Sequence, residues 1–146
     1  GLITPEDRSR SPKMRHNRSH KYESAFVGVQ IENSPAVLLE NLQGCQLGIW
    51  VAHGEGRFDF PLPISEYPVA LRYNYNSYPA NPNGSPEGIA GVCSPDGRHL
   101  AMMPHPERCL RPWNWPYYPI ERKNDEVTPW IRMFENGRIW LEKNAE

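Results

Sequence analysis

The sequence predicts a mixed, strand-rich α/β protein that makes up only part of a domain. Its 146 residues include 16 prolines, roughly twice the usual ~5% share, and a proline disrupts a helix interior by removing a backbone donor. Apolar residues alternate as in strands before residue 104, whereas helical periodicity is found only at the end of the chain. Parallel strands are normally connected through helices. A chain in which the strands come first and a single helix comes last therefore favours an incomplete domain.

Charge is unevenly distributed along a chain whose formal net charge is only −1. Residues 1–21 carry six Lys or Arg side chains against two acidic ones. We expect this stretch to be a basic connector, with regular structure beginning near Tyr22. It lacks the interleaved aromatic residues of a protein that binds single-stranded nucleic acid, so nucleic acid is not an expected partner.

Cysteine and histidine spacing predicts neither a disulfide framework nor a metal site. Cys45, Cys93 and Cys109 are odd in number and far apart, which is typical of a reducing cytosol, and no Cys-x-x-Cys pair is present for zinc. His16 and His20 have the i, i+4 spacing of two ligands on a helix, but the residues around them favour a polar loop. Neither a run of about 20 apolar residues nor a signal peptide is found, so we expect a soluble, cytoplasmic protein without a membrane partner.

Strand-like patterns dominate between residues 25 and 60. Residues 25–31 alternate apolar side chains onto one face, and a proline turn separates them from a short apolar strand at 36–39. Residues 46–52 form a nearly unbroken apolar run, which is typical of a strand buried on both faces. In 57–60 two phenylalanines alternate with charged residues, and this pattern predicts a further strand.

The middle of the chain predicts an antiparallel hairpin next to an irregular, proline-rich loop. Residues 69–75 alternate again, whereas the prolines and the Asn-Gly pair of 79–86 exclude a helix or a central strand. Two strands, 88–93 and 99–103, follow. They are joined by Ser-Pro-Asp-Gly at 94–97, whose last two residues tolerate the dihedral angles of a tight turn.

A single convincing helix closes the chain after a proline-rich and aromatic loop at 104–128. The helix is predicted over 129–142, with Thr128 as its N-cap and Pro129 at its first position. Its apolar face is expected to hold Trp130, Met133, Phe134 and either Trp140 or Leu141.

A histidine braced by two prolines is the most informative chemical feature. His105 lies between Pro104 and Pro106 after a predicted strand, and both prolines stiffen the loop. Because positions i and i+2 of an extended backbone point the same way, Glu107 can accept from one ring nitrogen of His105 and leave the other free as a base. These two residues are the candidate catalytic pair. Spacing alone favours the plainer alternative, a structural pair on a loop.

The nucleophile that such a pair would serve is expected to lie outside this sequence. Cys93 belongs to a hairpin rather than to the strand-to-helix elbow that exposes a nucleophile. Cys45 precedes a strand instead of following one. Cys109 is too close to His105 in sequence to be a separately placed partner.

A glycine-rich turn after the apolar run at 46–52 is a candidate substrate-binding site. His53, Gly54 and Glu55 follow that predicted strand, and ligand sites gather at strand ends in α/β sheets. A plain tight turn with exposed side chains is an equally weighted alternative. The stiff loop at 78–88 offers amides and hydroxyls for substrate or partner contacts, with a polar surface loop as its alternative.

Three long motifs carry a family resemblance. Ala-His-Gly-Glu-Gly at 52–56, Tyr-Pro-Ala-Asn-Pro-Asn-Gly-Ser-Pro at 78–86 and Met-Met-Pro-His-Pro-Glu-Arg at 102–108 occur in this order and spacing, and Thr128–Arg138 matches as well. From about Asn17 onward, the chain resembles the C-terminal part of the glutaminase domain of phosphoribosylformylglycinamidine synthases of the large single-chain type. These are class I glutamine amidotransferases.

The resemblance implies a Cys-His-Glu triad that hydrolyses glutamine, in which His105 and Glu107 are the histidine and the glutamate. In the family the cysteine lies on an upstream elbow. Residues 1–21 would therefore follow that elbow, and residues 22–146 would form the C-terminal part of the domain. The expected architecture is an incomplete class I amidotransferase domain that has no glutaminase activity by itself.

Cofactors and partners also follow from the resemblance. No cofactor or metal is expected in this stretch, whereas ATP and magnesium are implied for a synthetase domain that uses the ammonia to amidate formylglycinamide ribonucleotide in purine biosynthesis. The expected partners are glutamine, the upstream nucleophile-bearing segment and the synthetase domain of the same polypeptide. The alternative is a non-catalytic module that docks on a synthetase domain.

Overall fold

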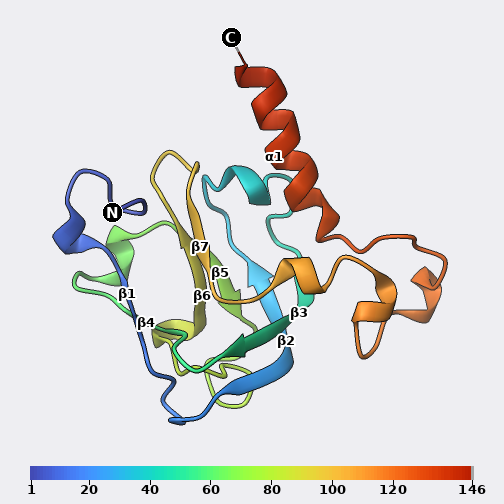
Figure 1. The fold of residues 1–146 in the computed structure, drawn as a ribbon, viewed down its shortest axis with the longest axis horizontal. Coiled ribbons are helices and arrows are strands. Elements are labelled where there is room, and N and C mark those ends of the chain that lie inside the picture. Colours follow the sequence, from blue (N-terminus) through green and yellow to red (C-terminus); the bar gives the residue numbers. More distant parts are fainter. Residues whose placement is uncertain (146) are drawn as a thin grey trace.

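The computed structural model describes residues 1–145 and is built around a five-stranded sheet (Figure 1). Its strands are β2 (Glu23–Ile31), β3 (Gln46–His53), β5 (Val69–Tyr73), β6 (Ile89–Cys93) and β7 (Leu100–Met102). They lie in the order β3-β2-β5-β6-β7, and each neighbouring pair is antiparallel. Together with the terminal helix α1 (Ile131–Asn144), this sheet confirms the strand-rich α/β class that the sequence predicts.

One face of the sheet carries most of the apolar core. Side chains two residues apart point to the same face of a strand, and Val29, Ile31 and Ile49 are all fully buried on this face. Trp130, also fully buried, packs into the same cluster. Its indole N–H donates to the carbonyl of Gly48 at 2.8 Å, so the residue before α1 is anchored directly to β3.

β3 is an edge strand, and the prediction that 46–52 is buried on both faces is wrong. Ile49 is fully buried on the core side, but Trp50 on the other side is only partly buried. An aromatic ring covers this second face in part, because Phe26 packs against Trp50 with ring centroids 5.1 Å apart. The free edge of β3 instead contacts His105, whose backbone N–H donates to the Trp50 carbonyl at 2.8 Å.

The first 21 residues are more structured than the predicted basic connector. A 3₁₀ turn at Arg8–Arg10 is followed by β1 (Lys13–Arg15), which pairs antiparallel with β4 (Arg57–Asp59). Regular structure therefore begins before Tyr22. All three residues of β1 are exposed, so this strand has no apolar alternation that would reveal it in the sequence.

Residues 36–39 form a 3₁₀ turn over Val37–Leu39 instead of the predicted strand. The N–H of Val37 donates to the carbonyl of Gly97 in the β6–β7 hairpin. Leu39 is fully buried. The turn thus buries Leu39 and contacts the hairpin without adding a strand to the sheet.

The predicted hairpin of β6 and β7 is confirmed. Gly91 lies opposite Met102 in an antiparallel pair, and the turn residue Gly97 has φ of 72°. A Cβ atom on Gly97 would lie 1.9 Å from the carbonyl oxygen of Pro35. Glycine is therefore required here both by the left-handed backbone and by the close approach of the neighbouring segment.

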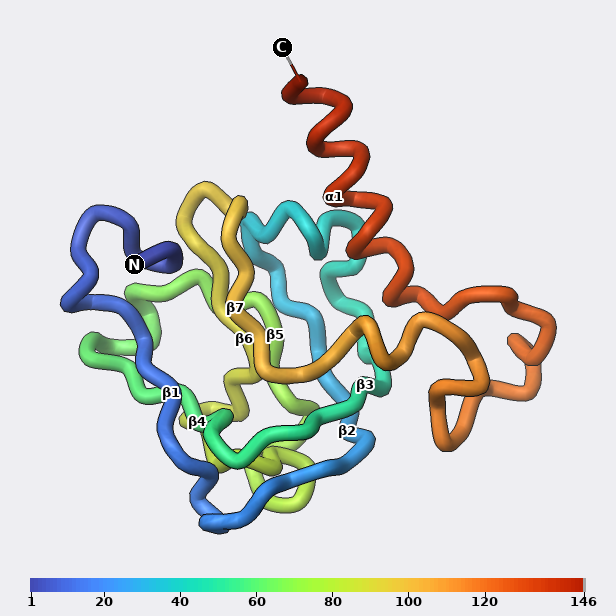
Figure 2. Tube along the Cα trace, in the orientation of Figure 1, coloured from blue at the N-terminus to red at the C-terminus, as the bar shows by residue number. Residues whose placement is uncertain are grey.

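The proline-rich segment 104–128 is irregular, as predicted. It contains three 3₁₀ turns, at Pro106–Arg108, Pro112–Asn114 and Ile120–Arg122. Its later part extends away from the sheet on the side of β3 (Figure 2). The segment thus runs from the end of β7, past the free edge of β3, and back to α1.

Helix α1 begins at Ile131 rather than at residue 129, and Trp130 occupies the N-cap in place of the predicted Thr128. The Thr128 hydroxyl donates to the carbonyl of Cys109 instead. This bond ties Thr128 to the preceding loop, and no side chain within residues 1–145 caps the N-terminus of α1.

Only the start of the predicted apolar face of α1 is buried. Met133 is buried, but Phe134 and Leu141 are 49% and 64% exposed. The far end of the helix projects from the rest of the fold (Figure 1). Within residues 1–145, no helix is both long enough and apolar enough to cross a lipid bilayer.

Replacing Gly97 with alanine should destabilise the protein more than replacing Gly44 with alanine. Both glycines have positive φ, so each alanine carries a backbone cost of about 1–2 kcal/mol. Only Gly97 adds a clash with Pro35, because nothing lies within 4 Å of a Cβ on Gly44. We expect Gly97→Ala to lower the free energy of unfolding by about 1–3 kcal/mol more than Gly44→Ala, as measured by chemical denaturation. Equal losses would contradict the close packing of Gly97 on Pro35.

Candidate active site

His105 and Glu107 lie side by side just beyond the end of β7. His105 Nδ1 and Glu107 Oε1 are 2.8 Å apart, which confirms that the two side chains pair. The expected extended backbone is wrong, because Glu107 lies in a 3₁₀ turn at Pro106–Arg108. Because an ionised carboxylate only accepts, a neutral His105 carries its proton on Nδ1 and its lone pair on Nε2. No hydrogen bond within residues 1–145 engages that Nε2. The His105 side chain is 30% exposed, so the ring can be approached by a reacting group.

Two contacts hold the backbone of His105 against β3. The first is its N–H bond to the Trp50 carbonyl. The second is the buried thiol of Cys109, which accepts from the Trp50 N–H at 3.4 Å and donates to the His105 carbonyl at 3.5 Å. Burial raises the pKa of this thiol to about 11, and the Trp50 N–H offsets that only in part. Cys109 is therefore a protonated structural thiol and not a nucleophile.

His53, at the end of β3, points into the interior rather than into solvent. Its side chain is 6% exposed, and its Nε2 lies 3.3 Å from Nδ2 of Asn83, which also donates to the Tyr73 hydroxyl at 3.1 Å. Burial, followed by the positive charge of His105, lowers the pKa of His53, and the carboxylate of Glu23 opposes them. His53 is therefore neutral near pH 7 and accepts from Asn83 through Nε2.

The three predicted substrate-binding residues do not share one surface. His53 is buried, whereas the exposed carboxylate of Glu55 pairs with His16 at 3.3 Å. Gly54 lies between them, outside any strand. Gly56 completes the turn, because a Cβ there would lie 2.2 Å from Cδ2 and 2.3 Å from Nε2 of His53. Because the His53 ring points inward and lies against residue 56, a glycine is required at position 56.

Two buried asparagines support this turn. Neither is among the predicted site residues, although Asn83 lies in the loop at 78–88 that is predicted to offer amides for contacts. Asn17 donates to the carbonyl of His53 at 2.7 Å, and Asn83 contacts the His53 ring; both are fully buried. They lie in the polar segments 1–21 and 79–86. No local pattern distinguishes a buried asparagine from an exposed one, because these contacts join residues 36 and 30 positions apart.

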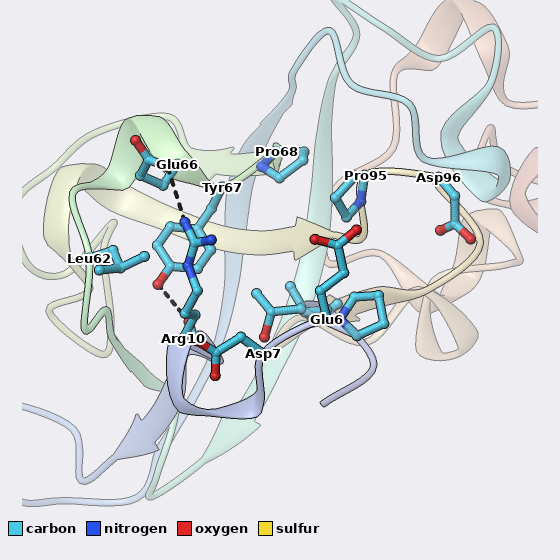
Figure 3. Close-up of a pocket in the computed structure, with 12 residues that line it drawn as sticks. Glu6, Asp7, Arg10, Leu62, Glu66, Tyr67, Pro68, Pro95 and Asp96 are labelled. Carbon is cyan, nitrogen blue, oxygen red and sulfur yellow. Dashed lines mark hydrogen bonds and ion pairs between the residues drawn. The ribbon is translucent and has the colours of Figure 1, made fainter.

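A separate hollow of about 270 Å³ lies between the N-terminal segment and two turns of the chain (Figure 3). Arg10 pairs there with Glu66 at 3.2 Å, and the Arg10 carbonyl accepts from the Tyr67 hydroxyl at 2.6 Å. Neither His105 nor His53 lines this hollow. It is therefore not part of the candidate active site.

No ligand set for a metal ion is found in the described part of the chain. Within residues 1–145, no three His, Cys, Asp or Glu side chains converge as metal ligands would. His16 and His20 lie in an irregular segment after β1, as predicted, and not on a helix.

Residues 1–141 match the family of CobB/CobQ-like glutamine amidotransferase domains. The chain belongs to this family. It is 46% identical over 145 residues to the probable phosphoribosylformylglycinamidine synthase, chloroplastic/mitochondrial, of Arabidopsis thaliana, and 42% identical over 139 residues to the phosphoribosylformylglycinamidine synthase of Homo sapiens. These alignments cover 90% and 87% of the chain but 10% of each relative. The chain therefore spans about a tenth of the length of these relatives, and the resemblance found in its motifs is confirmed.

A solved structure supports the same relationship. PurLQS from Thermotoga maritima matches with a TM-score of 0.68 and 28% sequence identity, over 90% of this chain and 53% of that one. The antiparallel sheet and terminal helix described above are thus a portion of a glutamine amidotransferase-type fold.

Gly56→Ala should displace the His53 ring, whereas Gly54→Ala in the same turn should be tolerated. A Cβ on Gly56 would overlap the ring, but a Cβ on Gly54 would meet only Tyr22, at 3.9 Å. We expect Gly56→Ala to lower the free energy of unfolding by about 1–3 kcal/mol and Gly54→Ala to change it by less than about 0.5 kcal/mol. Urea denaturation measures both, and the NMR signals of the His53 ring should move only in Gly56→Ala. Equal effects of the two variants would contradict the packing described for this turn.

The three cysteines should differ in reactivity. Burial raises the pKa of Cys93, and it raises the pKa of Cys109 to about 11. At pH 8, only about one part in a thousand of Cys109 is therefore thiolate. Cys45 is partly exposed. We expect a colorimetric disulfide reagent to label one thiol quickly and the other two only on unfolding, with the fast phase absent in Cys45→Ser. Rapid labelling of Cys109 would contradict its structural role.

Proposed function

We propose that the chain is the C-terminal part of the glutaminase unit of a phosphoribosylformylglycinamidine synthase. In this role it takes part in glutamine hydrolysis, which supplies ammonia for the ATP-dependent amidation of formylglycinamide ribonucleotide. The family match and the names of the relatives support the assignment. The observation that carries it is the 2.8 Å contact between His105 and Glu107, which leaves Nε2 of a partly exposed imidazole ready to take a proton.

His105 is the proposed general base. A cysteine thiol from another part of the complete enzyme gives its proton to His105 Nε2, and the thiolate attacks the side-chain amide carbon of glutamine. The imidazolium returns that proton to the nitrogen as the C–N bond breaks and ammonia leaves, and water then hydrolyses the thioester to glutamate. Glu107 stabilises the imidazolium and keeps the neutral ring in its Nδ1–H form.

The neutral state of His53 suits this chemistry. A second cation beside the His105 imidazolium would oppose its formation, and the lowered pKa of the buried His53 keeps that side chain uncharged. His53 is assigned to the glutamine site as the residue that shapes the turn.

Gly54 and Glu55 are assigned to the same glutamine site through their backbone. Their N–H groups make no hydrogen bond within residues 1–145. Consecutive free N–H groups can bind an anionic oxygen. They therefore offer donors for the carboxylate of glutamine, whereas the exposed Glu55 side chain points to His16.

The other parts of the reaction are assigned to other segments of the proposed enzyme. ATP and magnesium belong to a synthetase domain, and this chain is assigned no cofactor of its own. Its proposed partners are that synthetase domain and the segment that bears the nucleophile. Neither nucleic acid nor a membrane is among them, and the proposed location is the cytoplasm.

The test is His105→Ala in the complete enzyme. We expect glutamine-dependent turnover to fall by about 10²–10⁴-fold, because the general base is lost, while turnover with ammonium chloride stays at the unaltered level. Glu107→Gln should reduce glutamine-dependent turnover less and shift its pH profile. His99→Ala, a histidine in the β6–β7 hairpin, is the control and should retain both activities.

A non-catalytic docking module is the second candidate function. It is favoured by exposed aromatic side chains outside the site, since Trp113 and Tyr117 are each 74% exposed on the segment that extends from the sheet. Under this alternative, His105→Ala leaves both activities unchanged. That result would refute the glutaminase role, and a selective loss of glutamine-dependent turnover would refute the docking role as the sole function.

A further inference from the structure

Asn17 binds three of the four residues in the turn 53–56. Its side-chain Nδ2 donates to the carbonyl of His53 at 2.7 Å, and its backbone N–H donates to the carbonyl of Gly54 at 2.8 Å. Its Oδ1 accepts from the N–H of Gly56 at 3.1 Å. The turn is therefore held from the inside by one residue that is distant in sequence.

The amide of Asn17 is fully used and fully buried. Nδ2 makes a second bond, to the carbonyl of Lys21 at 2.9 Å, so both amide hydrogens and the amide oxygen have partners. Asn17 has no exposed surface. Removing this side chain would take one bond from the buried carbonyl of His53 and leave the N–H of Gly56 without its partner, which costs more than the loss of a solvated bond.

These bonds divide the polar groups of the turn into two sets. The carbonyls of His53 and Gly54 and the N–H of Gly56 are turned inward and engaged by Asn17. The N–H groups of Gly54 and Glu55 form no hydrogen bond within residues 1–145. By fixing the inward set, Asn17 determines where these two free donors point.

We propose that Asn17 is a positioning residue of the glutamine site, which holds the turn 53–56 in the shape that receives the substrate. The inference rests on the function proposed above, because glutamine is the ligand that the turn is assigned to bind. Asn17 touches neither His105 nor Glu107 in any hydrogen bond described here; it acts on the substrate through His53, Gly54 and Gly56.

The catalytic pair is held by different contacts from those of Asn17. His105 is fixed by the Trp50 backbone and by the Cys109 thiol. A change at Asn17 is therefore expected to weaken glutamine binding, to leave ammonia-dependent turnover unchanged, and to reduce the chemical step less than the binding step.

The experiment compares Asn17→Ala and Asn17→Asp with Asn136→Ala in the complete enzyme. Asn136 is a matched control: it is 4% exposed, and its Nδ2 donates to the carbonyls of Leu38 at 3.1 Å and Glu40 at 2.7 Å, where α1 meets the 3₁₀ turn. We expect Asn17→Ala to raise the KM for glutamine by about tenfold or more, with a smaller change in kcat. Asn17→Asp keeps the acceptor for Gly56 and should have an intermediate effect. Asn136→Ala should lower stability without changing KM.

Amide hydrogen exchange in the same proteins tests the positioning role separately from activity. The Gly54–Gly56 amides should exchange faster in the Asn17 variants and at the unaltered rate in Asn136→Ala. If Asn17→Ala fails to fold, the KM for glutamine and the amide exchange rates of Asn17→Asp test the positioning role in its place.

The two proposals can fail independently of each other. Unchanged exchange in the turn, or a KM for glutamine that moves no more than in Asn136→Ala, would overturn the role of Asn17. Absence of glutamine-dependent turnover in the unaltered enzyme would instead refute the proposed function, and the exchange rates would still show whether Asn17 holds the turn.

Discussion

The free edge of β3 is the constraint on which the arrangement of the candidate site depends. An edge strand presents unpaired backbone donors and acceptors, and at Trp50 both are engaged by the segment that carries the candidate catalytic pair. The Trp50 carbonyl accepts from His105, and the Trp50 N–H donates to the Cys109 thiol. His53 lies three residues farther along the same strand. One strand therefore sets the positions of the candidate base and of the turn assigned to the substrate.

Most buried polar groups beside β3 are paired, although within residues 1–145 Nδ1 of His53 and Oε1 of Glu23 are buried without a hydrogen-bond partner. Asn17 and Asn83 are fully buried, and each makes several hydrogen bonds, which offsets the cost of removing amides from water. Burial lowers the pKa of His53, so this side chain stays neutral and adds no buried charge.

The chemistry assigned to the chain needs a nucleophilic thiol, which its two buried cysteines are not suited to supply. Cys93 and Cys109 are buried with raised pKa values, and neither is suited to attack an amide. The exposed aromatic and aliphatic side chains on the segment before α1 and on α1 itself, among them Trp113 and Leu141, are the kind of surface that other protein segments cover. Both features agree with a chain that spans about a tenth of its relatives.

The sequence by itself determined the strand-rich class, the β6–β7 hairpin and the pairing of His105 with Glu107, because each follows from residues close together in the chain. The alternation of apolar residues, the turn residues of the hairpin and the short spacing from His105 to Glu107 are local signals with local causes. Only the tertiary structure decided that 46–52 is an edge strand, that 36–39 is a turn and that Asn17 is buried. These outcomes depend on partners far away in sequence: Asn17 meets His53 across 36 positions, and the free edge of β3 exists because nothing but the His105 segment pairs with it in the described residues. A local pattern of apolar and polar residues predicts the type of element, whereas the packed fold decides how much of it is buried and against what.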